Sequence, residues 1–276
     1  VETLGRYRLL VLADQRILSD AECEAIEKFV AGGGSLIVTG ETGLRDKDNR
    51  PRRDFALADV LGVTWRGEQV SPRCYFRMES ALDEYGIPVM DVQAGHGYVW
   101  IRETDSTVLT SLVPSGGAKN APGGDIIGPG ITVNRYGRGQ VIYCASKLFH
   151  AYFQFGNSMY RKLFLWMLDT VYPEQNRLAV LKNAPINVEM FLNARGNERF
   201  IHLVNYSGDK REAGAPQVQE MVTVHGILIR VKADTRPKRI SLVPDGRDIA
   251  FSYRDGWAEF DAEPLEIHGV YRIEGA

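Results

Sequence analysis

The sequence predicts an α/β domain followed by an antiparallel β-sandwich, and three observations lead to this fold class. Near the start, two apolar strand-like runs flank one amphipathic helix-like segment. Beyond residue 185, about seven short alternating strands are separated by turn residues, which is typical of a sandwich. The chain has 276 residues, more than one domain usually contains. We expect two domains, residues 1–174 and residues 175–276.

The first predicted element is a buried strand over residues 7–14, "YRLLVLAD". Its nearly continuous apolar run is typical of a parallel strand that is covered on both faces. A second such run, "SLIVTG", spans residues 35–40. Two parallel strands joined by one helix form a βαβ unit, whose crossover is right-handed by default.

The connecting helix is predicted in "LSDAECEAIEKFVAGGG" (18–34). Ser19 followed three residues later by Glu22 is a capping box, so the helix begins there. Three apolar side chains share the face that we expect to be buried: Ile26, Phe29 and Val30. The glycines at 32–34 stand where a left-handed C-terminal cap is needed.

These glycines do not form a phosphate-binding loop. They follow the helix and lie at its carbonyl end, whereas phosphate binds at helix N-termini. A dinucleotide-binding G-x-G-x-x-G that started at Gly32 would need glycine at 37, where the sequence has Ile37. The G-x-x-x-x-G-K-[ST] motif does not occur either. We therefore interpret the glycines as a helix stop and expect no cofactor.

Further short elements complete the first domain. "DFALADVLGV" (54–63) is expected to form a short helix, and "PSGGAKNAPGGD" (114–125) a mobile surface loop. Strands are expected in "HGYVWIR" (96–102), "TVLTSLV" (107–113), "GITVNRYG" (130–137) and "QVIYC" (140–144). "NSMYRKLFLWMLDTVY" (157–172) forms a helix that ends before Pro173. The aromatic residues within 149–167 can pack in the core or face a sugar or a partner subunit, and we favour the core.

The second domain is predicted from alternating strands with no helical segment among them. The strands are "INVEMFLN" (186–193), "RFIHLVNY" (199–206), "MVTVHGILIRVK" (221–232), "RISLVP" (239–244), "IAFSY" (249–253), "WAEFDA" (257–262) and "LEIHGVYRI" (265–273).

Charge and cysteine content exclude several classes of partner and site. The net charge of -2, with both signs interspersed, offers no basic surface for nucleic acid or an anionic membrane. No apolar run approaches the roughly 18–20 residues that span a bilayer. The three cysteines, Cys23, Cys74 and Cys144, stand at unrelated spacings, so we expect free thiols in the cytoplasm. The chain begins at Val1 and soon enters a strand, so we expect it to be part of a longer protein.

Candidate functional residues follow the carboxyl ends of the parallel strands, where ligands bind in α/β domains. They are Asp14 and Gln15 after the first strand, and Gly40, Glu41 and Thr42 after the second. A nucleophile elbow would carry Ser or Cys between glycines at the second position, but the residue there is Glu41. We interpret Glu41 as a loop carboxylate, and keep it as a weak candidate base or nucleophile.

Cys144 is the best candidate thiol because it ends a strand that precedes a helix, and His150 lies six residues later. No further motif completes a catalytic triad, so we favour a buried structural cysteine. The five histidines, His96, His150, His202, His225 and His268, are scattered without metal-ligand spacing, so we expect no metal site.

Five segments of the chain resemble a known family. "YRLLVLADQRILSDAECEAIEKFVAGGGSLIVTGETGLRDKDNRPRRDFALADVLGV", with "RYGRGQVIYCAS" and "LFLWMLD" later, resembles the glutamine-amidotransferase-like domain of microbial glycoside hydrolases, known as the beta-galactosidase trimerisation domain. "ERFIHLVNYSG" and "PKRISLVPDGRDIAFSYRDGWAEFDAEPLEIHGVYRIE" look like the β-domain that closes such hydrolases. The resemblance covers nearly the whole chain, through structural rather than catalytic motifs.

The resemblance implies a flavodoxin or class I glutamine-amidotransferase-like three-layer domain whose first strand and helix are missing here. It also implies that the catalytic carboxylates lie on an upstream (β/α)8 barrel, and that this domain has lost its cysteine nucleophile. The domain then serves the association of subunits into a homo-oligomer, a trimer by resemblance. Carbohydrate substrate would meet this region only indirectly.

The leading hypothesis is therefore a non-catalytic assembly region of a beta-galactosidase-like glycoside hydrolase, with no catalysis by this chain alone. A rival is an amidotransferase-like hydrolase that uses Cys144 or Glu41, and it predicts a reactive thiol with a lowered pKa. A third hypothesis makes the sandwich a sugar-binding module, with exposed Trp257 or Tyr253 as its platform.

Overall fold

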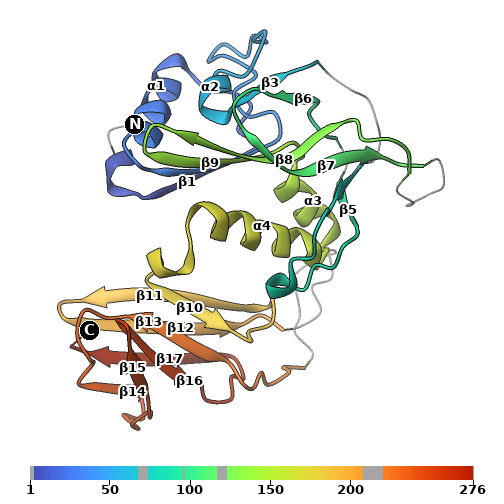
Figure 1. Cartoon of the computed structure of the whole chain (residues 1–276). Helices are drawn as coiled ribbons and strands as arrows, with labels where there is room; N and C mark the ends of the chain where they lie inside the picture. The colour runs from blue at the N-terminus through green and yellow to red at the C-terminus, as the bar shows by residue number, and fades with distance from the viewer. Residues whose placement is uncertain (1–2, 68–73, 96, 117–122, 208–219, 276) are drawn as a thin grey trace. The chain divides into compact units, whose positions relative to one another are not determined.

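A computed structural model describes residues 3–67, 74–95, 97–116, 123–207 and 220–275 (Figure 1). The chain separates into two compact units, Val1–Pro173 and Glu174–Ala276. The first unit is mixed α/β, built on one seven-stranded sheet, and the second contains two antiparallel sheets.

The seven-stranded sheet of the first unit has the strand order β1-β2-β9-β8-β7-β4-β5. β1, β2 and β9 are parallel, whereas each of the other neighbouring pairs is antiparallel. The strands are β1 (Leu9–Ala13), β2 (Ser35–Thr39), β4 (Cys74–Arg77), β5 (Asp91–Gly95), β7 (Thr107–Pro114), β8 (Gly128–Tyr136) and β9 (Gly139–Cys144). The sequence did not predict β4 and β5.

The two predicted strands of the βαβ unit differ in burial. All five residues of β2 are buried, as expected for a strand covered on both faces. β1 is only half-buried, and Val11 is 37% exposed. The expectation of full burial is wrong for β1 because it is the edge strand of the sheet and pairs only with β2.

Helix α1 (Asp20–Ala31) confirms the predicted capping box. The Ser19 hydroxyl accepts a hydrogen bond from the Glu22 backbone N–H at 3.3 Å, and Glu22 Oε2 accepts one from the Ser19 N–H at 2.8 Å. The left-handed residue at its end is Gly33, with φ +109°. Gly34 is needed for packing, because a Cβ there would lie 2.4 Å from Cζ of Phe29.

The remaining helices of this unit are α2 (Ala58–Leu61), α3 (Leu148–Phe155) and α4 (Ser158–Val171), with short 3-10 turns η1 (Leu4–Arg6) and η2 (Asp83–Tyr85). Figure 1 shows α1 and α2 on one face of the sheet and α3 and α4 on the other. Within the described part of the chain, no helix has the length and apolarity that a membrane span needs.

α2 is shorter than the helix expected over 54–63. Asp54 explains the difference, because its Oδ1 accepts hydrogen bonds from the backbone N–H groups of Phe55 and Trp65, at 2.8 and 2.7 Å. The Thr64 hydroxyl also donates to Asp54. These contacts hold residue 54 in a turn, so the helix starts only at Ala58.

The expected strand over 96–102 is wrong for most of its length. Its C-terminal end contributes to β6 (Ile101–Glu103), which pairs with β3 (Val63–Trp65) in a separate two-stranded sheet. Val99 N–H instead donates to the Ala145 carbonyl at 2.7 Å, which ties this segment to the residue after β9. His96 and residues 117–122 of the expected surface loop lie outside the described residues.

The second unit consists of two four-stranded antiparallel sheets, with orders β10-β13-β16-β15 and β11-β12-β17-β14. Its strands are β10 (Ala179–Lys182), β11 (Val188–Arg195), β12 (Glu198–Asn205), β13 (Leu228–Lys232), β14 (Arg239–Val243), β15 (Ser252–Arg254), β16 (Trp257–Asp261) and β17 (His268–Glu274). Buried residues of both sheets, such as Ile201 and Ile229, share one hydrophobic core. The described part of this unit has one helical segment, the 3-10 turn η3 (Glu174–Asn176).

Candidate functional site

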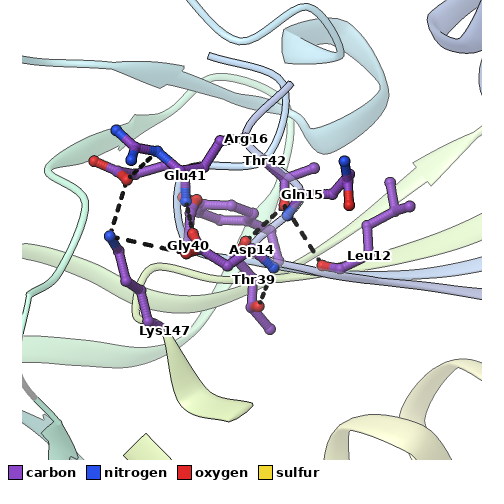
Figure 2. Close-up of polar contacts among 10 residues, drawn as sticks. Leu12, Asp14, Gln15, Arg16, Thr39, Gly40, Glu41, Thr42 and Lys147 are labelled. Atoms are coloured by element: carbon purple, nitrogen blue, oxygen red, sulfur yellow. Dashed lines mark hydrogen bonds and ion pairs between the residues drawn. The ribbon is translucent and has the colours of Figure 1, made fainter. Parts of the chain in front are cut away.

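The residues that follow the three parallel strands converge at one edge of the sheet (Figure 2). Asp14 follows β1, Glu41 follows β2, and Lys147 lies between β9 and α3. This edge is the usual position for ligands in α/β domains. The structure thus brings together Asp14 and Glu41, which the sequence places at strand ends, and adds Lys147.

The turn after β2 requires glycine at position 40. Gly40 has φ +60°, and a Cβ built there would lie only 2.2 Å from Asp14 Oδ1. The same Oδ1 accepts a hydrogen bond from the Glu41 backbone N–H at 2.7 Å. Asp14 itself is left-handed, with φ 53°, a conformation that aspartate tolerates better than most residues. The two loops are therefore closely interlocked.

The charged groups at this edge neutralise one another. Glu41 Oε2 lies 2.9 Å from Lys147 Nζ and 2.8 Å from Arg16 Nε, and Figure 2 shows it between the two cations. Asp14 Oδ2 lies 3.8 Å from the same Nζ. The Glu41 side chain is 20% exposed and that of Lys147 is 28% exposed. Two carboxylates and two cations thus share a partly buried edge.

Burial affects the titration of Asp14. Burial raises the pKa of its carboxyl above the usual range, although the hydrogen bond from the Glu41 N–H and the charge of Lys147 act in the opposite direction. The desolvation of Asp14 therefore outweighs the favourable contacts that its charge makes.

Hydroxyl groups fix the backbone around these charges. The Asp14 N–H donates to Thr39 Oγ1 at 3.1 Å, and the Gln15 N–H donates to Thr42 Oγ1 at 3.0 Å. The Thr42 hydroxyl donates to the Thr39 carbonyl at 2.8 Å. The buried Tyr143 hydroxyl donates to the Gly40 carbonyl at 2.8 Å. These contacts leave the strand ends little freedom to rearrange.

These contacts are suited to holding a turn. A catalytic carboxylate needs a free lone pair that faces the substrate, and a thiol or hydroxyl nucleophile needs an adjacent base or a lowered pKa. One oxygen of Glu41 is already shared between two cations. Among the contacts of the described residues, no histidine or cysteine side chain bonds to Glu41 or Asp14.

Cys144, the candidate thiol, is buried in the hydrophobic core of the first unit. Its side chain is fully buried, and burial raises the pKa of its thiol to about 11. Its closest polar contact is Ser146 Oγ, 3.5 Å from Sγ. His150 is exposed to solvent on α3, so the structure does not pair it with the buried thiol. A reactive cysteine would instead be accessible and have a lowered pKa.

The other two cysteines give no alternative nucleophile. Cys23 and Cys74 are also buried and unpaired, and burial raises the pKa of the Cys74 thiol to about 12. Across the residues with described positions, no group of three or more His, Cys, Asp or Glu side chains is placed to hold a metal ion.

Sequence reasoning missed Arg16 and Lys147. Lys147 follows the third parallel strand, so the rule that singles out Asp14 and Glu41 applies to it equally. Arg16 has no comparable signal, because an arginine in a loop is ordinary and its partner is 25 residues away in sequence.

The structure corrects one expectation about aromatic residues and confirms another only in part. Trp257 is not an exposed platform: it is buried, and the Arg230 guanidinium lies 4.8 Å from its ring centre. Tyr253 is half-buried, and its hydroxyl donates to the Ala233 carbonyl at 3.1 Å. Packing in the core holds for Tyr160 and Phe164, whereas Phe149 is half-buried with its ring against Phe164, and Phe153 is 90% exposed.

Comparison with known proteins gives a consistent family assignment for the first unit. The family model described as the beta-galactosidase trimerisation domain matches residues 1–169. A curated relative, the beta-galactosidase BbgII of Bifidobacterium bifidum, is 32% identical over 146 residues, which are 51% of this chain and 20% of that protein.

Solved structures share the fold over nearly the whole chain. An alpha-L-fucosidase isoenzyme 2 from Paenibacillus thiaminolyticus superposes with a TM-score of 0.82 at 22% identity, covering 98% of this chain and 41% of that one. A beta-galactosidase from Bacillus circulans sp. alkalophilus gives 0.62 at 16% identity, covering 98% and 33%. The chain therefore spans less than half of each of these proteins.

Proposed function

Because this chain belongs to the beta-galactosidase trimerisation domain family, we propose that it is a non-catalytic assembly region of a longer, carbohydrate-active glycoside hydrolase. Its role is to associate subunits and to support an active site that another part of the protein carries. The observation that carries this proposal is the family match over residues 1–169.

The geometry of the strand ends supports a role without catalysis. Glu41, at the elbow position, is held between Lys147 and Arg16. Cys144 is fully buried as a neutral thiol. Cys144 has neither access to substrate nor an activating base, and Glu41 has one carboxylate oxygen held by two cations. We propose that the catalytic carboxylates lie on an upstream (β/α)8 barrel, and that carbohydrate is bound there.

We infer a finer architecture for both units. The first is a three-layer domain of the flavodoxin or class I glutamine-amidotransferase type, a proposal supported by helices on both faces of its parallel strands. The second is a β-sandwich, supported by the hydrophobic core that its two antiparallel sheets share. The three free, buried thiols favour a reducing compartment, and we propose the cytoplasm.

We propose a homotrimer as the assembled state and the exposed end of α3 as part of its contact surface. Phe153 and Phe155 are 90% and 44% exposed there, although aromatic side chains usually lose most of their exposure on folding. Aromatic residues are also enriched at the contact surfaces between proteins.

The proposal is tested first by the mass and assembly state of the product of the complete gene. A barrel would add about 250 residues ahead of this chain. We expect a subunit roughly twice the 30.9 kDa of this chain, trimeric by light scattering, with glycosidase activity that the isolated 276-residue chain lacks.

A substitution tests the contact surface. Phe153→Ser is expected to weaken the trimer, whereas Val222→Ser, at a position 65% exposed in the second unit, is the matched control. A monomeric product of about the size of this chain, or hydrolysis by the chain alone that Cys144→Ala abolishes, would contradict the proposal.

A further inference from the structure

Two histidines lie side by side on the second unit. His202 is in β12 and His268 begins β17, and these strands pair antiparallel. His202 is opposite Val270, and His268 is opposite Val204, so the two are diagonal neighbours. Both face outward, because the alternate residues Ile201, Leu203 and Tyr271 are buried.

The two imidazole rings meet through their nitrogens. His202 Nδ1 lies 3.2 Å from His268 Nε2, while the ring centres are 5.4 Å apart and the ring planes differ by 13°. The nitrogens are thus much closer than the ring centres, so the rings meet edge to edge. In a hydrogen bond of this kind one nitrogen carries the hydrogen and the other offers a lone pair.

We propose that His202 and His268 form a binding site for a divalent transition-metal ion, zinc in the first instance. Two Zn–N bonds of about 2.05 Å at a tetrahedral angle hold their nitrogens about 3.3 Å apart. The observed separation of 3.2 Å matches that requirement, and a turn of roughly 35° by each ring points both lone pairs toward one shared ion. The metal takes the place of the bridging hydrogen.

The strands make the pair a preorganised ligand set. β12 is the neighbour of both β11 and β17, so the positions of the two Cα atoms are fixed by ladders of hydrogen bonds. His202 is half-buried and His268 is exposed, so water can complete the coordination. The exposed Glu189 lies opposite Val204 on the same outward face, and its carboxylate adds negative charge beside the pair.

The chemistry of the pair decides which ions it accepts. Neutral imidazole suits zinc, copper and nickel, whereas magnesium and calcium require oxygen ligands. Binding to two neutral rings needs no net loss of a proton. The bridging hydrogen moves through solvent to the far nitrogen of its own ring, leaving both inner nitrogens with free lone pairs.

The test is calorimetric titration of Zn²⁺ into the full chain and into three variants. His202→Gln and His268→Gln are each expected to weaken zinc binding by at least about tenfold. His225→Gln removes an exposed histidine of the same unit and is expected to bind zinc as the wild type does. Zinc should also raise the melting temperature of the wild type, because it binds only the folded pair.

Ring resonances of the wild-type histidines give a readout that needs no variant. Zinc is expected to shift the signals of two histidines, whereas equal concentrations of Mg²⁺ leave them unchanged. Unchanged zinc binding in both His202→Gln and His268→Gln, or no uptake at about millimolar Zn²⁺, would overturn the proposal. The zinc titration does not depend on subunit association, so its result leaves the proposed assembly role untouched.

Discussion

The ends of β2 and β9 are neighbours in the sheet, yet their candidate groups have opposite environments. Glu41 follows β2, stays partly accessible, and is held by two cations. Cys144 ends β9, is fully buried, and has a thiol whose pKa is raised to about 11. The carboxylate is charged but neutralised by its partners, and the thiol is uncharged because it is desolvated.

The difference shows that polar groups at neighbouring strand ends can be stabilised in two ways, by ion pairing and by burial. At the end of β2, the Glu41 carboxylate forms ion pairs with Arg16 and Lys147 from two other loops. At the end of β9, the Cys144 side chain is part of the core. Variants that affect one end without the other can test this contrast.

The largest effect is expected for Gly40→Ala. The new Cβ would lie 2.2 Å from Asp14 Oδ1, so the Asp14 side chain must move and give up its hydrogen bond to the Glu41 N–H. A left-handed residue other than glycine costs about 1–2 kcal/mol, and the lost hydrogen bond to a charged group about 1.5–3 kcal/mol. We expect unfolding of the first unit in urea to show a loss of about 3 kcal/mol.

Gly156→Ala is the matched control for that variant. Gly156 has φ +61°, nearly the same as Gly40, and lies in the same unit, but a Cβ there meets nothing within 4 Å. It should cost only the backbone strain, about 1 kcal/mol. Equal losses in the two variants would show that the contact with Asp14 contributes nothing.

The second effect concerns Cys144 at alkaline pH. A thiol whose pKa is raised from 9.0 to about 11 by burial stays protonated in the folded state, while the unfolded chain loses that proton earlier. The protonated thiol therefore contributes about 2–3 kcal/mol to the free energy of unfolding below pH 9. This contribution is lost as the pH rises toward 11. Cys144→Ala should remove this part of the pH dependence.

Thiol labelling provides a second measurement on the same residue. In native protein we expect Cys144 to react with a disulfide reagent only as fast as the first unit opens, and at the ordinary rate in urea. Rapid labelling of Cys144 in the native state would remove the contrast between the two strand ends and favour the hydrolase hypothesis.

The third effect is that of Glu41→Gln, which leaves Lys147 and Arg16 with Asp14 as their only carboxylate in the group. Because the Arg16 side chain is 46% exposed, solvent screens part of the interaction, and we expect a loss of about 1 kcal/mol that shrinks at high salt. Glu24→Gln, in the exposed pair with Lys28, should change stability by a few tenths of a kcal/mol. A similar small change for Glu41→Gln would mean that its ion pairs do not hold the turn.

The sequence predicts those parts of this site that local chemistry determines. Ser19 and Glu22 form a capping box over four residues, and strand ends in an α/β pattern point to Asp14 and Glu41. Distant pairing is not encoded in that way. Glu41 and Lys147 are 106 residues apart, and only the order of β2 and β9 in the sheet brings them together.

The failures in the fold have the same origin. β1 has the composition of a buried strand, but its position at the sheet edge leaves Val11 partly exposed. Trp257 directly follows a turn, so the sequence predicts a surface position. In the structure, Arg230 on the neighbouring strand β13 covers its ring. Phe153 belongs to an apolar segment, and nothing in the local pattern separates it from Phe149. Burial depends on partners that the local sequence does not specify.

The smallest effect is expected for Asp14→Asn. Asparagine tolerates the φ of 53° and keeps an oxygen that accepts the Glu41 N–H, so the variant removes the charge and little else. Burial raises the pKa of the Asp14 carboxyl, which means that the charged form is disfavoured on folding. At pH 7 we therefore expect a change within about 0.5 kcal/mol.

The pH dependence of Asp14→Asn gives the sign of that effect. Because the pKa of Asp14 in the folded state is raised above 3.8, its protonated carboxyl stabilises the folded state. This stabilisation is fully present below pH 3.8 and is lost as the pH rises through the folded pKa. The free energy of unfolding of the wild type should therefore rise relative to that of Asp14→Asn as the solution is acidified toward pH 3. Asp14→Ala, which removes the acceptor as well, should cost about 1–2 kcal/mol at pH 7. If Asp14→Asn cost as much as Asp14→Ala, the charge of Asp14 would stabilise the turn, and the neutralised cluster at β2 would depend on both carboxylates.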